Sequence, residues 1–126
     1  MSFAAGTQID TIDGNVPIEK LSKTGMVKIY DGSYVPFTFS GSYGTEQTTI
    51  LTLSTGGEII CTLDQMFLSN EDWIEAKDAM GMFFYNEEME DKLFVKSMRI
   101  GGRRQVYKLV VPTGDFCLAG GIIVTP

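Results

Sequence analysis

Short runs of β-branched and aromatic residues, separated by glycines, occupy most of this sequence and constrain its fold more than any other feature. Residues of these types favour strands, whereas glycines favour the turns between strands. A hairpin is expected at Gly56-Gly57, and Pro36 is expected on a sheet edge or at a bulge. The pattern predicts strands at 27–30, 34–39, 48–53, 58–62, 92–100, 105–111 and 121–124, with Gly101-Gly102 separating the fifth from the sixth.

Only two segments carry helical signals, and both are short. Residues 17–23 begin with a proline, which suits a first helical turn, and residues 71–80 follow Asn70, a favourable N-cap residue. The second helix would place Trp73 and Ile74 in an apolar stripe facing a sheet. Two short helices are too few for a doubly wound fold, so the predicted fold class is all-β.

These two segments also repeat each other. Ile18-Glu19 precedes Gly25-Met26 by 25 − 18 = 7 residues, and Ile74-Glu75 precedes Gly81-Met82 by 81 − 74 = 7 residues. The offset between the copies is 74 − 18 = 56, which is close to half of the 126 residues. An internal duplication explains this shared spacing. It predicts a single all-β domain, residues 1–126, built from two related halves around one core.

The composition argues against two classes of partner. The net charge is −6, and an acidic chain lacks the basic face that nucleic acid requires. The pair Arg103-Arg104 is too short to change this, so no nucleic-acid partner is expected. No apolar run approaches the roughly 18 residues of a membrane helix, so no membrane partner is expected either.

The sequence contains no histidine, the side chain most often used for proton transfer near neutral pH. Any catalysis would have to use carboxylate, lysine, tyrosine or hydroxyl groups. Cys61 and Cys117 both lie in apolar runs, which favours two buried free thiols in a reducing compartment over a disulfide. Two cysteines without histidine make a poor zinc site, and no metal or other cofactor is expected.

Four segments, in order along the chain, resemble the motifs of the Hint family, the self-splicing domains of inteins and Hedgehog-type proteins. They are 2–7 followed by Asp13-Gly14, 58–67, 106–111 followed by Asp115-Phe116, and 120–124. The resemblance covers nearly the whole chain. It implies an all-β, horseshoe-like fold with a pseudo-two-fold internal repeat, whose termini lie close together on adjacent central strands. The acidic stretch 86–92 lies where many inteins carry an endonuclease, and here it is only a loop.

The resemblance also implies site positions in the first half of the chain. Ser2 stands where the family has the nucleophile that attacks the carbonyl of the preceding peptide bond, although by itself it is only a polar residue near a terminus. Thr62, Asp64 and Gln65 lie in the Thr-x-x-His motif, whose histidine protonates the scissile amide. Glutamine donates hydrogen bonds but transfers no proton near neutrality, and Thr62 could simply bridge two strands.

The remaining implied positions lie near the end of the chain. Lys108 stands where the family most often has aspartate. It could act as a base if it were buried, but an exposed strand lysine is expected. Thr125 and Pro126 stand where the family has a histidine and the asparagine that cyclises to release the following segment. Proline has no side-chain amide, so this step lacks its reactant.

Two functions are consistent with these residues. The first is an intein-like splicing or autoprocessing domain, inactive as written, whose substrates would be the flanking polypeptide segments (exteins). The second is a non-catalytic Hint fold reused as a structural or binding module in a larger assembly, with a protein partner that the sequence does not identify. Whether the chain is an enzyme stays open between them. A reducing cytoplasm or a viral particle is the expected location.

Overall fold

Twelve strands and two single-turn 3-10 helices make up the computed structural model, which describes residues 2–69, 72–85, 91–115, 117–119 and 121–125. For Tyr43, 91–92 and 117–118 it describes the backbone alone. None of the described residues forms a helix long and apolar enough to cross a membrane. The elements are β1 (Phe3–Ala4), β2 (Gln8–Thr11), β3 (Gly14–Pro17), η1 (Ile18–Lys20), β4 (Thr24–Lys28), β5 (Tyr34–Leu53), β6 (Glu58–Thr62), β7 (Met66–Ser69), β8 (Asp72–Glu75), η2 (Ala76–Asp78), β9 (Phe83–Tyr85), β10 (Asp91–Val110), β11 (Cys117–Ala119) and β12 (Ile122–Val124).

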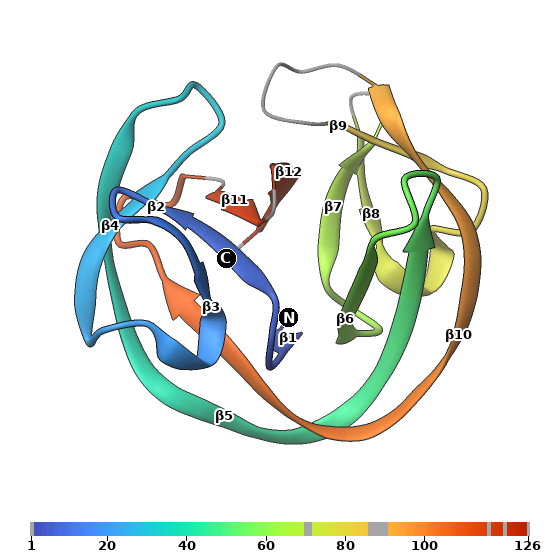
Figure 1. Ribbon diagram of the computed structural model, residues 1–126, viewed down its shortest axis with the longest axis horizontal. Coiled ribbons are helices and arrows are strands. Elements are labelled where there is room, and N and C mark those ends of the chain that lie inside the picture. The colour runs from blue at the N-terminus through green and yellow to red at the C-terminus, as the bar shows by residue number, and fades with distance from the viewer. Residues whose placement is uncertain (1, 70–71, 86–90, 116, 120, 126) are drawn as a thin grey trace.

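Two long strands, β5 and β10, form the base of a horseshoe (Figure 1). Each has 20 residues, and they pair antiparallel from Leu53↔Val95 to Thr38↔Val110. Register shifts interrupt the ladder at four places along β10. Each shift adds a bulge, and bulges bend a strand and increase its twist. The two strands therefore curve together and raise the remaining elements into two facing arms.

The predicted turn at Gly101-Gly102 is one of these bulges, so the prediction of two separate strands there was wrong. Gly102 has φ of 76°, and the register shifts between Ile100 and Gly102 while both residues stay within β10. The predicted strands 34–39 and 48–53 are likewise parts of one strand, β5. Glycine allows the backbone conformation of a turn and of a bulge alike, so the residue type did not distinguish them.

The two arms are related by a pseudo-two-fold repeat. In one arm Gln8 of β2 pairs with Pro17 of β3, and in the other Met66 of β7 pairs with Glu75 of β8. The offset is therefore 66 − 8 = 75 − 17 = 58 residues at this point. The next backbone bond repeats as well, since Ile18 N donates to Thr7 O and Ala76 N donates to Gln65 O, both at 2.8 Å. The predicted internal duplication is confirmed. The residue of the second half that is equivalent to Ile18 is Ala76, however, and not Ile74 as the sequence spacing predicted.

Both predicted helices were wrong in extent. The first is the single turn η1, and the second is the single turn η2, preceded by strand β8. Trp73 and Ile74 lie in β8, where they pair with Leu68 and Phe67 of β7. The local helix signals were the proline that begins 17–23 and Asn70 before 71–80. Such signals do not distinguish an α-helix from a single 3-10 turn. Pairing with the neighbouring strand decided between the two conformations.

The predicted hairpin at Gly56-Gly57 and the predicted edge position of Pro36 are both confirmed. Leu53 N donates to Gly57 O at 2.8 Å, which closes the expected hairpin between β5 and β6. Pro36 pairs with Met26 of β4, while the ladder with β10 begins only at Thr38. Pro36 therefore lies at an edge of β5, as expected. Strands β1, β2, β3, β7, β8 and β11, each of two to four residues, were not predicted, because so few residues carry little pattern.

The apolar core lies between the arms and joins strands that are far apart in the sequence. The ring of Phe67 stacks on that of Phe84 with centroids 4.4 Å apart, and Phe3 meets Phe67 edge-on at 6.4 Å. All three side chains are buried. Aromatic pairs in these geometries add about 0.5–1.5 kcal/mol each beyond the area that they bury. They join β7 to β9 within one arm, and β7 to β1, the strand near the N-terminus.

The bulge in β10 yields a test of the fold. A Cβ at Gly101 would collide with the Thr48 hydroxyl and lie 3.1 Å from the Thr48 carbonyl oxygen. Gly101→Ala should therefore lower the free energy of unfolding by about 1–3 kcal/mol, the usual cost of overpacking. Gly57→Ala is the matched control, because a Cβ there would meet only Thr55 Oγ1 at 3.7 Å. Urea denaturation of both variants decides; equal losses would contradict the close approach of β5 and β10.

Candidate functional site

The turn 62–65, between β6 and β7, is in contact with both ends of the chain. Gln65 N donates to Thr62 O at 3.2 Å, which closes the turn. Ser2 is bonded to Thr62, and Thr125 is bonded to Gln65. Figure 1 shows both chain ends between the two arms. The close approach of the termini is confirmed, but β1 and β12 are not paired with each other, so the expectation of adjacent strands was wrong.

Ser2 is fully buried, and its backbone is held on both sides by Thr62. Ser2 N donates to Thr62 Oγ1 at 3.0 Å, and Thr62 N donates to Ser2 O at 3.0 Å. Within the part of the chain that the structure describes, Ser2 Oγ has no hydrogen-bond partner. Ser2 is therefore not an exposed terminal residue. Its backbone position is fixed by the turn 62–65.

The Thr62 hydroxyl links Ser2 to an acid. Its Oγ1 accepts from Ser2 N. Its single proton has two acceptors within reach, Asp64 Oδ1 at 2.8 Å and Ser2 O at 3.3 Å, and the shorter contact, to a carboxylate, is the stronger. Desolvation acts to raise the pKa of Asp64, yet the net shift is downward from 3.8, and the bond from Thr62 is the largest of the contributions that lower it. Asp64 is thus a carboxylate over the physiological range. Hydrogen bonds thus run from Ser2 N to the Thr62 hydroxyl and from that hydroxyl to the Asp64 carboxylate.

Gln65 is fully buried and ties the end of the chain to the same turn. Its Nε2 donates to Thr125 O at 2.9 Å, to Met66 O at 3.2 Å and to Thr125 Oγ1 at 3.3 Å. Gln65 Oε1 is buried without a partner among the described residues. The Met66 carbonyl also accepts from Thr125 N at 3.4 Å. Sequence reasoning missed Met66, because a residue that binds through its backbone carbonyl cannot be recognised from its side chain. The amide therefore binds the chain end rather than the backbone of Ser2.

Lys108 lies in β10 next to the residue that pairs with β1. Phe3 pairs with Tyr107, and beyond this last pair of the ladder Ser2 and Lys108 are the next residues of the two segments. The ladder between β10 and β5 shifts between Tyr107 and Leu109, which puts Lys108 in a bulge. Its side chain is half-buried, so the expectation of an exposed lysine was wrong. Tertiary structure buries it because β1 covers that stretch of β10.

The remaining candidates fall outside this cluster or outside the described residues. Pro126 lies outside the described residues, as does the side chain of Cys117. Cys61 is a buried free thiol that pairs with Phe3, and burial, together with the charge of Asp64, raises its thiol pKa to about 12. It is protonated at neutral pH and is no nucleophile. Among the described residues there is no group of three or more metal-ligating side chains.

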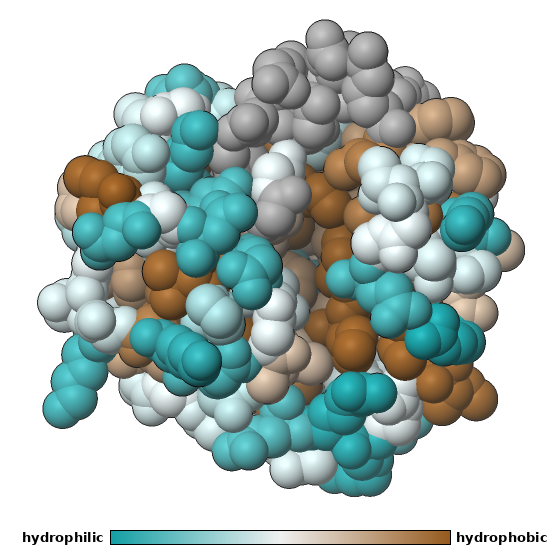
Figure 2. All heavy atoms as spheres, viewed as in Figure 1, coloured by the Kyte–Doolittle hydropathy of each residue, from teal (hydrophilic) through white to brown (hydrophobic). Residues whose placement is uncertain are grey.

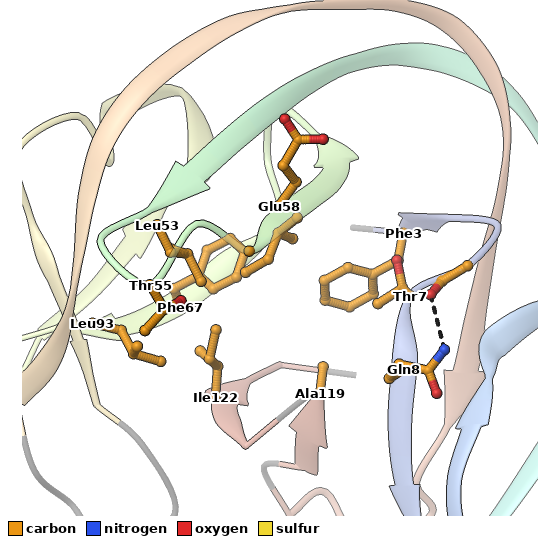
Figure 3. Close-up of a pocket in the computed structure, with 13 residues that line it drawn as sticks. Phe3, Thr7, Gln8, Leu53, Thr55, Glu58, Phe67, Leu93, Ala119 and Ile122 are labelled. Atoms are coloured by element: carbon orange, nitrogen blue, oxygen red, sulfur yellow. Dashed lines mark hydrogen bonds between the residues drawn. The ribbon is translucent and has the colours of Figure 1, made fainter.

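An apolar cavity of about 400 Å³ lies between the arms, beside the polar cluster. Its wall includes Phe3, Leu53, Phe67, Leu93 and Ile122, whose side chains face one another in Figure 3. Figure 2 shows the hollow as a band of hydrophobic residues with hydrophilic residues on either side. None of the sequence-predicted site residues lines it. The cavity and the Ser2 cluster are therefore distinct features of the cleft.

No protein-family model matches the sequence, and no curated protein matches it. Solved structures do match over almost the whole chain. The gp41-1 intein has a TM-score of 0.81 at 20% identity, covering 99% of this chain and 98% of that one. A DnaB intein from Synechocystis sp. PCC 6803 has a TM-score of 0.79 at 18% identity, covering 98% and 96%.

This chain has the Hint fold of inteins. A bacterial intein-like domain from Clostridium thermocellum is similar too, with a TM-score of 0.75 at 20% identity over 98% of this chain and 96% of that one. These matches agree with the horseshoe, the pseudo-two-fold repeat and the closeness of the chain ends. At such low identity they establish the fold, and the chemistry of the Hint cleft has to be judged from its own residues.

The shifted pKa of Asp64 gives a test of the turn 62–65. A carboxyl group whose folded pKa lies below 3.8 stabilises the fold above that pH, and the contribution is lost as the pH falls through the folded value. Asp64→Asn should therefore lower the stability at neutral pH, and the deficit should shrink as the pH falls below 3.8 and through the folded pKa of Asp64. Denaturation curves across this range measure it. Asp13→Asn, at an exposed turn, is the control, and a deficit that stays constant with pH would refute the assignment.

Proposed function

We propose that this chain is an intein-like autoprocessing domain whose peptide-bond chemistry is blocked. The observation that carries the proposal is Gln65, a buried amide in the place of the motif's histidine, with its Nε2 bonded to Thr125 O at 2.9 Å. The Hint fold and the convergence of both chain ends on the turn 62–65 support the intein-like part. The residues of the cluster support the block, one step at a time.

The first step of such chemistry would need two proton transfers. Attack by Ser2 Oγ on the preceding carbonyl carbon forms a C–O bond and breaks the C–N bond. The hydroxyl proton must leave Oγ, and the departing Ser2 nitrogen must gain a proton. No described group accepts from Ser2 Oγ. Among the described residues, the only side chain bonded to Ser2 N is the Thr62 hydroxyl, which accepts that bond and whose own proton is nearest to Asp64 Oδ1.

Asp64 does not supply the missing proton. Its pKa is lowered, so it is ionised at neutral pH and only accepts hydrogen bonds. Gln65 does not supply it either, because an amide neither gains nor loses a proton near neutrality. Loss of a general acid or base typically slows a reaction by about 10²–10⁴-fold. Lys108, which follows the residue that pairs with Phe3, is a basic residue where the family most often has an acidic one.

The last step of splicing would lack its reactant. Release at the C-terminal end requires a side-chain amide to attack its own backbone carbonyl, and position 126 is proline. Thr125 stands at the position of the assisting histidine. Its carbonyl is already engaged by Gln65. Flanking polypeptide segments would therefore remain attached at this end.

The second candidate function is a structural or binding module in a larger assembly. The contacts of Gln65 favour it, because a buried amide that bonds both Thr125 and Met66 stabilises the closed cleft. In this role Gln65 stabilises the folded domain and takes no part in a reaction. Its partner would be another protein segment, and a reducing cytoplasm or a viral particle would suit the buried thiol of Cys61.

The blocked first step is tested by trapping. A reporter domain fused ahead of Ser2 is incubated with hydroxylamine or a strong thiol, which capture an ester or thioester. We expect the release of reporter to equal that of a Ser2→Ala control, because Ser2 Oγ lacks a base and Ser2 N lacks an acid. Mass spectrometry quantifies both products. Release well above the Ser2→Ala control would show that the chemistry survives.

Restoring the residues that the resemblance implies tests the intein-like part of the proposal. The combined variant Ser2→Cys, Gln65→His and Lys108→Asp should show thiol-dependent cleavage ahead of position 2. Each single change should do little, since residues that act as a unit are strongly non-additive. The same triple variant with Thr62→Val is the matched control, because it removes the hydroxyl that holds Ser2 N. A folded triple variant that cleaves no faster than this control would favour the non-catalytic module.

A further inference from the structure

The hairpin formed by β11 and β12 bridges the two arms of the horseshoe. Ala119 of β11 pairs with Ile9 of β2, and Val124 of β12 pairs with Phe67 of β7. Ile9 and Phe67 are equivalent positions of the repeat, because 67 − 9 = 58 is the offset found for β2 and β7. One hairpin thus adds a strand to the same edge of both halves. Its position sets where the chain end meets Gln65.

The turn of this hairpin is held by a carboxylate from the first half. Ala119 pairs with Ile122, and Gly121 between them has φ of 81°, a conformation that favours glycine. Gly121 N donates to Asp10 Oδ2 at 3.0 Å, across 111 residues of sequence. Asp10 is only 9% exposed. A buried carboxylate is costly unless it is well hydrogen-bonded, so its placement against this amide is a specific feature of the fold.

The repeat shows that the fold itself does not require an acid at this position. The residue equivalent to Asp10 in the second half is Leu68, since 68 − 10 = 58. Both residues follow the core position that pairs with the hairpin, Ile9 and Phe67 respectively. Only the half that receives the turn of the hairpin has a carboxylate. The difference between the two halves therefore coincides with the contact to Gly121.

We infer that Asp10 is a positioning residue that fixes the C-terminal hairpin and, through it, the contact of Thr125 with Gln65. Asp10 borders a polar cavity of about 390 Å³ together with Lys28, Tyr34 and Gly121, and it is the only carboxylate on the described wall of that cavity. Without the carboxylate, the hairpin keeps its pairing to β2 and β7 but loses the bond at its turn. The turn then opens locally, and β12 with the following Thr125 is held less firmly against β7 and Gln65. This role is independent of whether any splicing chemistry survives.

Hydrogen exchange on the whole chain tests the inference. The variant Asp10→Leu copies the equivalent residue of the other half, and it should speed amide exchange at Gly121 and Ile122–Val124 by about tenfold or more. Exchange in the β5–β10 ladder should change by less than about twofold. Asp10→Asn keeps an oxygen that can accept from Gly121 N, so it should restore most of the protection. Asp13→Asn, an exposed acid near the same strand, is the control.

Two results would overturn the inference. One is unchanged exchange at Gly121 in Asp10→Leu, and the other is an equal increase throughout β5 and β10, which would mean a general loss of stability. If Asp10→Leu does not fold, the unaltered protein still decides by NMR. On acidification the Gly121 amide proton should shift with the same midpoint as the Asp10 carboxyl carbon. A Gly121 signal that does not follow that titration would refute the contact.

Discussion

The antiparallel pairing of β5 with β10 is the constraint on which the rest of the structure depends. Two strands of 20 residues would form a twisted but unbent ribbon if their ladder were regular, and four register shifts bend them into a curved base. The curvature raises β2 to β4 on one side and β7 to β9 on the other. The contacts between the arms and the chain ends, including the edge-on contact of Phe3 with Phe67, follow from that geometry.

The cleft brings together parts of the chain that no local interaction could join. Ser2 reaches Thr62 across 60 residues, Gln65 reaches Thr125 across 60, and Asp10 reaches Gly121 across 111. Each contact is a hydrogen bond to a buried group, and each would be costly to break because the abandoned partner would stay buried. These bonds make the chain ends part of the folded structure. The position of the ends is therefore fixed by the fold.

Around Ser2, the backbone geometry and the side chains that would transfer protons are determined by different parts of the sequence. The backbone of Ser2 is held on both sides by Thr62, which is the arrangement that a nucleophile beside a scissile bond requires. The proton transfers depend on side-chain identity alone, and there Gln65, Asp64 and Lys108 provide an amide, an ionised acid and a positive charge. Strand pairing fixes the geometry of the Hint fold, whereas proton transfer depends on which side chains occupy it.

By itself, the sequence determined the all-β class, the hairpin at Gly56-Gly57, the edge position of Pro36 and the existence of two related halves, because period, glycine placement and spacing are local properties. It also identified Thr62 and Gln65 through the family resemblance. Tertiary structure alone decided that 72–75 forms a strand, that Gly101-Gly102 is a bulge, and that the repeat offset is 58 in β2 and β7. It also decided the burial of Ser2, Lys108 and Asp10. The strand 72–75 depends on pairing with the nearby β7, which overrode the local helical signal. The bulge depends on the pairing of β5 with β10 across 42 or more residues, which no short window of sequence contains.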